Sequence, residues 1–220
     1  MSLLNNLIAG ISLGSVYAII ALGYSMVYGI ARMLNFAHGD VIMVGAYVCF
    51  FAISQYSLPP VVGVLLAMVI CTVLGIIIER LAYKPLRQAT SLAVLITAIG
   101  VSYFLQNSAL LLWKSDPKSF PLFISRDVFW LNVSPVTVVT VLVCVVVMLG
   151  LTWYTNKTRM GKAMRACSEN KDAALLMGID VNRTISVTFA IGSALAAVAG
   201  ILYCLAYQQN LTPTPGSLPG

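Results

Sequence analysis

Residues 7–30 read LIAGISLGSVYAIIALGYSMVYGI, a run of 24 residues without a charged side chain. About 20 apolar residues in an α-helix cross the roughly 30 Å hydrocarbon core of a bilayer. Neither Lys nor Arg occurs before Arg32, so the run lacks the basic segment that precedes the apolar core of a signal peptide. The sequence therefore predicts a retained first transmembrane helix.

Five more apolar runs indicate further crossings. Residues 41–78 carry no charge and are too long for one helix, but SQYSLPP at 54–60 divides them, because a Pro-Pro pair among polar residues marks a turn. The predicted spans lie near residues 7–30, 36–55, 60–80, 91–113, 136–154 and 184–207. They predict an all-α, polytopic transmembrane helix bundle of about six spans, forming a single domain over residues 1–220.

The composition agrees with a membrane protein and excludes other classes. Hydrophobic residues make up 60% of the chain and charged residues 9%, whereas a soluble domain carries about a quarter charged residues. The formal net charge is +6, but the basic residues lie between apolar runs and not along one face. Nucleic acid is therefore not expected as a partner. The five cysteines show no metal-ligand spacing, so no metal site is expected.

Lys and Arg are unequally distributed over the alternating loops. Ten of the 13 follow the first, third and fifth predicted spans, and the other three follow the fourth. Because cytoplasmic loops carry the excess of Lys and Arg, the first set is expected in the cytoplasm and the N-terminus outside. The outer loop of residues 114–135 contains Trp130, and Trp113 precedes it, which suits an interfacial aromatic belt.

Small residues four apart occur in two predicted spans. Such residues let helix backbones approach closely in lipid, although Gly and Ala are common in membrane helices in any case. Two such stripes favour a compact bundle over isolated anchors. The residues are Gly10, Gly14 and Ala18 in the first span and Gly192, Ala196 and Gly200 in the last.

The sequence Asn35-Phe-Ala-His-Gly-Asp40 places ionisable groups at the start of the second span. If that helix begins near Asn35, His38 and Asp40 lie at the inner membrane boundary, where an ionisable side chain is costly and suggests function. One interpretation is that the cluster lines or gates a pathway. The other is structural, with Asn35 as N-cap and Asp40 beside the positive helix start. The candidate pathway or gate residues are Tyr24, Asn35, His38, Asp40, Gln106 and Asn107.

The cytoplasmic loop of residues 156–182 is longer than the other inner loops. Residues 158–167 are expected to be helical, and a short helix is expected over 171–177, with Ser168 or Asn170 as N-cap and Gly178 at its end. The apolar residues 173–177 leave a surface that needs a partner. The loop is interpreted either as an anchor on the underside of the bundle or as a docking helix for a cytoplasmic protein. Its candidate residues are Arg165, Ser168, Glu169, Asn170, Asp172, Ala173, Met177 and Gly178.

The chain contains no G-x-x-x-x-G-K-[ST] phosphate-binding loop. It is therefore not expected to hydrolyse ATP itself. If it moves a solute against a gradient, the energy has to come from an ion or from another subunit.

Two blocks of the sequence resemble a known family. The first comprises residues 13–30, the Asn35–Asp40 segment and MVGAY at 43–47, and the second comprises GKAMRA at 161–166 and NKDAALLMGID at 170–180. Both are similar to the permease subunits of bacterial ATP-binding-cassette (ABC) importers for branched-chain, hydrophobic amino acids. The second block resembles the loop through which that family contacts its ATPase. Over almost the whole chain, the sequence is identified as a member of this family.

The resemblance implies a multi-pass protein of the bacterial cytoplasmic (inner) membrane that is not an enzyme. It implies a second homologous permease subunit, cytoplasmic subunits that bind ATP and Mg, and a periplasmic binding protein that delivers leucine, isoleucine or valine. The chain itself is then expected to bind no cofactor. Family members are longer, so the chain, which ends in the uncharged tail 211–220, is expected to be truncated at its C-terminus relative to them.

Three other functions are alternatives to this expectation. One is an ion-coupled secondary transporter that uses His38 and Asp40. Another is an ABC permease for a different small amino acid or amide. An intramembrane enzyme is disfavoured, because one histidine and seven acidic residues leave little material for a catalytic centre.

Overall fold

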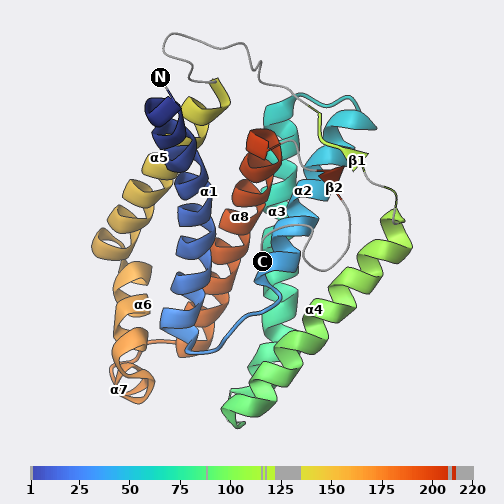
Figure 1. The fold of residues 1–220 in the computed structure, drawn as a ribbon. Helices are drawn as coiled ribbons and strands as arrows, with labels where there is room; N and C mark the ends of the chain where they lie inside the picture. The colour runs from blue at the N-terminus through green and yellow to red at the C-terminus, as the bar shows by residue number, and fades with distance from the viewer. Residues whose placement is uncertain are drawn as a thin grey trace.

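The computed structural model describes residues 2–87, 89–114, 116, 118–121, 135–207 and 210–211. These residues form a helical bundle, drawn in Figure 1. The helices are α1 (Ser2–Ala31), α2 (His38–Ser54), α3 (Pro60–Ile78), α4 (Ser91–Trp113), α5 (Pro135–Lys157), α6 (Arg159–Glu169), α7 (Lys171–Leu176) and α8 (Val181–Tyr207). A π-helical turn, η1 (Glu79–Tyr83), and a 3-10 turn, η2 (Lys84–Leu86), extend α3, and β1 (Lys118–Ser119) pairs with β2 (Asn210–Leu211) in antiparallel orientation.

The prediction of an all-α transmembrane bundle is confirmed. In the described part of the chain, five helices are long and apolar enough to cross a membrane, namely α1, α3 with its extension, α4, α5 and α8. The apolar helix α2 has only 17 residues and begins at His38, so it is shorter than the predicted span 36–55. Most of the predicted outer loop, including Trp130, and the tail 212–220 lie outside the described residues.

Local sequence signals explain several helix starts. Pro60 occupies the first turn of α3, where its missing N–H costs nothing. The Thr90 hydroxyl caps α4 by accepting a hydrogen bond from the Ala93 amide, and Thr158 caps α6 by accepting one from the Gly161 amide. These polar side chains satisfy backbone donors that a helix leaves unpaired at its N-terminus.

Helix α8 lies at the centre of the bundle. In the most apolar 18-residue stretch of α8, 67% of the residues are buried. In the corresponding stretches of the other four long helices the buried share is 17–28%. It packs between α1 on one side and α2 and α3 on the other, while α5 lies against α1 and α4 leans outward from the group (Figure 1). The core is therefore built around one helix, and the remaining helices present apolar side chains outward, as in a protein solvated by lipid.

Glycines in α8 and its neighbours set the close approach of these helices. A Cβ atom at Gly200 would lie 2.5 Å from the Ile42 carbonyl oxygen of α2, and one at Gly192 would lie 2.8 Å from the Val27 side chain of α1. Ala196 of the same stripe is fully buried. The structure thus places the predicted α8 stripe where backbones meet.

Within the described chain, the predicted stripe of small residues in α1 does not lie at a close contact between helices. A Cβ atom at Gly10 or Gly14 would meet nothing within 4 Å, and Ala18 is half-buried. The reason is that α8 meets α1 near Gly23, where the Gly192 carbonyl oxygen would lie 3.2 Å from an added Cβ atom. The close contact lies further along α1 than the sequence spacing indicated.

This difference gives a matched test of the packing. Gly200→Leu should destabilise the bundle by roughly 1–3 kcal/mol, because the added side chain forces α2 and α8 apart. Gly14→Leu should leave stability unchanged or raise it, because leucine favours a helix over glycine and has free space there. Thermal unfolding of both variants in detergent measures the effect. Equal midpoints would contradict the assigned contact.

Candidate functional site

The chain between α1 and α2 re-enters the bundle. Helix α1 ends at Ala31, and Arg32 has a φ of 54°, a left-handed conformation that stops a helix. In Figure 1 the following non-helical segment, residues 32–37, rises beside the helices and reaches the start of α2 part of the way up the bundle. Helix α2 is short because this segment covers the first part of the crossing.

His38 therefore lies well inside the bundle. A Cβ atom at Gly23 would be 3.1 Å from the His38 ring, so His38 is level with a residue eight positions before the end of α1. At 1.5 Å per residue this is about 12 Å from that end. The expectation that the second helix begins near Asn35 is corrected: α2 begins at His38, and the non-helical segment 32–37 precedes it.

Asn35 holds the re-entrant segment in place and does not cap α2. The residue at the N-cap position is Ala37, and no side chain caps this helix. The buried Asn35 side chain instead accepts a hydrogen bond from the Tyr83 hydroxyl at 3.0 Å. The backbone carbonyl oxygen of Asn35 accepts another from the His38 backbone amide. The structural interpretation of Asn35 as an N-cap is thus corrected: it links the segment to η1.

A polar cluster surrounds the start of α2. His38 and Asp40 are 4% and 7% exposed. The Gln106 amide of α4 donates a hydrogen bond to an Asp40 carboxylate oxygen at 2.9 Å and another to the Ser102 hydroxyl at 3.2 Å. The Tyr24 ring of α1 meets the His38 ring edge-on, with centroids 6.0 Å apart. The structure thus pairs four of the six candidate pathway residues, Tyr24 of α1 with His38 of α2 and Gln106 of α4 with Asp40 of α2.

Several atoms of this cluster have unused hydrogen-bonding capacity. In the described part of the chain, His38 Nε2, Asp40 Oδ2 and Gln106 Oε1 are buried without a hydrogen-bond partner. Buried polar atoms in native proteins are almost always paired, so unpaired ones call for an explanation. Their position among transmembrane helices makes them suitable for contact with a polar solute.

Asn107 lies apart from this cluster. Its side chain is exposed and donates a hydrogen bond to the Tyr103 carbonyl oxygen of its own helix at 2.7 Å. Consecutive helical residues point about 100° apart, so Asn107 cannot share a direction with Gln106. It is therefore not part of the cluster around the start of α2.

The predicted short helix forms in the loop 156–182 as α7. The Asn170 side chain caps it by accepting hydrogen bonds from the Asp172 and Ala173 amides at 2.9 and 3.1 Å. Ser168, the other predicted cap, instead donates to the Arg165 carbonyl oxygen. Gly178 ends the helix with a φ of 78°, which favours glycine.

Helix α7 has one packed face and one exposed apolar face. Ala174 is buried against Ile30, Met164 and Cys167. Outside this contact lies a surface that we call the apolar tip, formed by Leu175, Leu176 and Met177, which are 63%, 88% and 82% exposed. Figure 1 shows α7 at the end of the bundle away from the N-terminus, beside the lower ends of α1 and α8. The structure is therefore compatible with both interpretations of the loop, as an anchor and as a docking helix, since α7 packs on the bundle through one face and leaves its other face exposed.

The other candidates of this loop are solvent-facing. Arg165 donates to the Asn156 side chain at 3.1 Å, and Glu169, Asp172 and Ala173 are exposed. They form no cluster of ionisable groups with one another. Their arrangement is that of a polar surface around the apolar tip.

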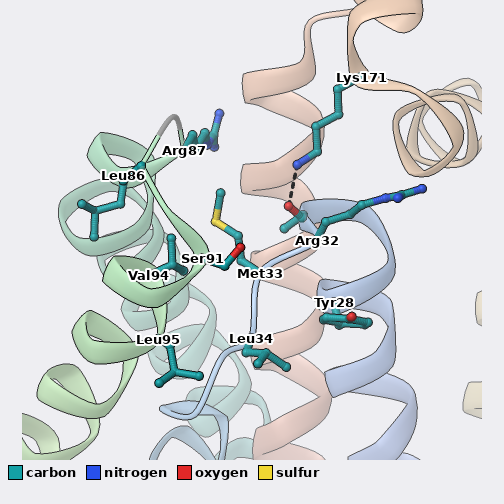
Figure 2. Close-up of a pocket in the computed structure, with 12 residues that line it drawn as sticks. Tyr28, Arg32, Met33, Leu34, Leu86, Arg87, Ser91, Val94, Leu95 and Lys171 are labelled. Atoms are coloured by element: carbon teal, nitrogen blue, oxygen red, sulfur yellow. Dashed lines mark hydrogen bonds between the residues drawn. The ribbon is translucent and has the colours of Figure 1, made fainter.

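Two hydrogen bonds join the end of α1 to the loop 156–182, one at the end of α6 and one at the start of α7. The Arg32 guanidinium donates to the Ser168 carbonyl oxygen at 2.6 Å. The Lys171 ammonium donates to the Ala31 carbonyl oxygen at 2.6 Å (Figure 2). Sequence reasoning used Arg32 and Lys171 only to orient the chain. They connect the loop 156–182 directly to the point where the re-entrant segment begins.

Arg32 and Lys171 border a cavity of about 280 Å³. Figure 2 shows Met33 and Leu34 of the re-entrant segment facing Val94 and Leu95 of α4, with Arg87 and Lys171 at the rim. Burial lowers the pKa of Lys171, and the charges of Arg87 and Arg32 lower it further. The inner end of the bundle thus combines apolar walls with a concentration of positive charge.

A buried ion pair, also missed from sequence, fixes the neighbouring helix ends. Glu79 is fully buried, forms a salt bridge with Arg87 and accepts a hydrogen bond from the Ser186 hydroxyl of α8 at 2.7 Å. Arg87 also donates to the Asn182 side chain. Such a network ties the end of α3 to the start of α8.

The hydrogen bond from Lys171 to Ala31 allows a direct test. Lys171→Met should keep the bundle folded but raise the rate of amide hydrogen exchange in α7 about tenfold or more, since a hydrogen bond from a charged group contributes about 1.5–3 kcal/mol. Lys171→Arg, which retains a donor, should change the rate less. Hydrogen exchange followed by mass spectrometry measures the difference. Equal exchange in α7 of Lys171→Met and of the wild type would contradict the assigned connection.

Comparison with known proteins gives consistent matches. The family model described as the permease component of branched-chain amino acid transport systems matches residues 6–215. The chain is 40% identical to the high-affinity branched-chain amino acid transport system permease protein BraD of Pseudomonas aeruginosa, covering 99% of this chain and 75% of that protein. It is 42% identical to LivH of Escherichia coli K12, a permease protein of the same description, covering 90% and 70%. A probable LivH of Methanocaldococcus jannaschii is 28% identical. No solved structure matches.

Proposed function

Because the chain belongs to the permease-component family of branched-chain amino acid transport systems, we propose that it carries leucine, isoleucine or valine inward across the cytoplasmic membrane. It does so as a multi-pass subunit of an ABC importer. It is a transport subunit and not an enzyme, and ATP hydrolysis takes place in a partner subunit. The relatives whose names support this substrate class are 40–42% identical to the chain.

Further components complete this transporter. The chain pairs with a second homologous permease, and the solute passes between the two. Cytoplasmic subunits bind ATP with Mg, while the permease chain binds no cofactor, and a periplasmic protein delivers the amino acid. The family description supports the presence of other components, because it names this chain's relatives as one component of a system.

The apolar tip of α7 is the docking element for the ATP-binding subunit. Exposed apolar side chains outside the membrane-spanning helices are stabilised when a partner covers them, and Leu176 at 88% exposure is the most open of the three. An amphipathic helix that inserts its apolar face into a groove is a common mode of recognition. The polar residues around the tip, including Glu169 and Asp172, form the rim of this contact.

Movement at the tip reaches the membrane through α1. The single observation that carries this mechanism is the pair of connections from Arg32 to Ser168 and from Lys171 to Ala31. Both end where α1 gives way to the re-entrant segment, and that segment leads to His38 within six residues. A shift of α7 on ATP binding therefore pulls on the short segment that positions the polar cluster, which provides a route for alternating access.

The polar cluster contacts the amino acid as it crosses. A branched-chain amino acid carries an ammonium and a carboxylate group, and both need polar partners at this depth. The free oxygen of Asp40 can accept hydrogen bonds from the ammonium group, and Gln106, which has an unpaired Oε1, lies beside it. The aliphatic side chain of the solute then lies against the apolar walls of the helices.

A secondary transporter is the alternative, and the burial of His38 and Asp40 favours it. Both would serve there as a proton or ion site. Proteoliposomes containing the complete complex separate the two functions. The proposed function predicts leucine uptake that requires ATP and the ATP-binding subunits and that is insensitive to a proton uncoupler. Uptake by the permease alone, driven by a proton gradient, would overturn it in favour of the alternative.

A further inference from the structure

A groove lies between the inner ends of α3 and α8, on the side of the bundle that the charge distribution assigns to the cytoplasm. Its volume is about 640 Å³. The lining combines basic and polar side chains with apolar ones: Ile76, Arg80, Lys84, Asp180, Asn182, Arg183, Ser186, Val187 and Ala190. We propose that this groove binds the headgroup of an anionic phospholipid of the inner leaflet.

The groove carries uncompensated positive charge. Arg80, Lys84 and Arg183 are exposed, and in the part of the chain that the structure describes their side chains form no hydrogen bond or salt bridge. The carboxylate of Asp180 accepts a hydrogen bond from the Arg183 amide at the start of α8. Three cations therefore face one carboxylate that already caps a helix, which leaves a net attraction for an anion.

Charge and apolar surface are arranged in the order that a phospholipid requires. Arg80 and Lys84 follow the end of α3 at Ile78, and Arg183 belongs to the first turn of α8. Ile76, Val187 and Ala190 line the groove further into the spanning parts of the same helices. A phosphate can thus contact the cations at the membrane surface while its acyl chains lie against the apolar wall.

The apolar wall also favours a lipid over the alternatives. Basic pockets between transmembrane helices on the cytoplasmic side bind anionic headgroups. A cytoplasmic protein could reach the cations but would have to enter the hydrocarbon region to cover Ile76, Val187 and Ala190. A free phosphate ion would leave that wall uncovered. The test takes the complex of the proposed function as its material, so loss of lipid and loss of the ATP-binding subunits are scored separately.

The experiment uses the intact complex in lipid discs of phosphatidylcholine with or without phosphatidylglycerol. A groove variant, Arg80→Gln with Lys84→Gln and Arg183→Gln, is compared with a control that loses equal charge elsewhere on the same side, Lys157→Gln with Arg159→Gln and Lys162→Gln. The control residues are exposed and belong to α5 and α6. Native mass spectrometry counts retained phosphatidylglycerol, and thermal unfolding measures the stabilisation that it gives.

We expect the wild-type and control complexes to retain phosphatidylglycerol and to unfold at a higher temperature in its presence. The groove variant should bind it about 100-fold more weakly, because each basic residue near the membrane surface contributes about a fivefold gain in affinity. Equal retention by the groove variant would overturn the proposal. So would a groove variant that loses its ATP-binding subunits while keeping the lipid, or a wild-type stabilisation that inorganic phosphate alone reproduces.

Discussion

Leu176→Glu should abolish ATP-driven leucine uptake by the assembled complex while the permease still inserts and folds. Leu176 is 88% exposed at the apolar tip, so the substitution removes no contact within the described chain. A carboxylate at the centre of an apolar interface costs at least about 2 kcal/mol, or roughly 30-fold in affinity. We expect the ATP-binding subunits to be lost during purification.

A conservative variant controls for this result. Leu176→Met keeps an apolar side chain of similar volume and should retain both association and uptake. The yield of monodisperse permease and its unfolding temperature should agree among the wild type and both variants. Normal uptake and normal association by Leu176→Glu would exclude the tip as the docking element and favour the anchor interpretation of the loop.

Asp40→Ala should produce the second large effect, a loss of uptake of roughly 30-fold or more with an intact complex. The substitution removes the acceptor proposed for the solute's ammonium group, and truncating one partner of a buried, hydrogen-bonded charge pair costs about 2–5 kcal/mol. Asp40 provides the carboxylate of the cluster, and its free oxygen is the acceptor assigned to the ammonium group of the solute. The defect should occur in the uptake rate at saturating binding protein and in the apparent affinity for leucine.

The neighbouring candidate on α4 supplies the matched control. Asn107 contacts the Tyr103 carbonyl oxygen of its own helix and lies outside the cluster. Asn107→Ala should therefore transport at the wild-type rate. Wild-type uptake by Asp40→Ala, or an equal loss in both variants, would show that the cluster is not part of the pathway.

Features that depend on local sequence could be predicted well. Apolar runs of about 20 residues defined five long helices, because hydrocarbon thickness sets helix length. The Asn170 cap and the Gly178 terminus of α7 were likewise readable, since a cap involves residues two or three apart and a left-handed position favours glycine. The family resemblance rested on these same blocks of sequence.

Features that depend on contacts between residues distant in the sequence could not be predicted from it. The re-entrant segment is held by the left-handed conformation of Arg32 and by the hydrogen bond from Tyr83 to Asn35. Tyr83 and Asn35 lie 48 residues apart in the sequence. The sequence around Asn35 is equally compatible with a helix start, so the sequence places the start of α2 near Asn35 and not at His38. The Arg32 and Lys171 connections join residues 136 and 140 positions apart, beyond the range of any local pattern.

Crosslinking at the tip of α7 tests the central claim of this account, that an ATP-binding subunit drives the permease from the cytoplasm through this helix. A photoreactive amino acid replaces Leu176 in the intact complex, and the adducts are identified by mass spectrometry. The account predicts adducts with the ATP-binding subunit, at a yield that changes when ATP is bound. Absence of such adducts, together with modification of Met177→Cys by a membrane-impermeant reagent added to the periplasmic side, would contradict it.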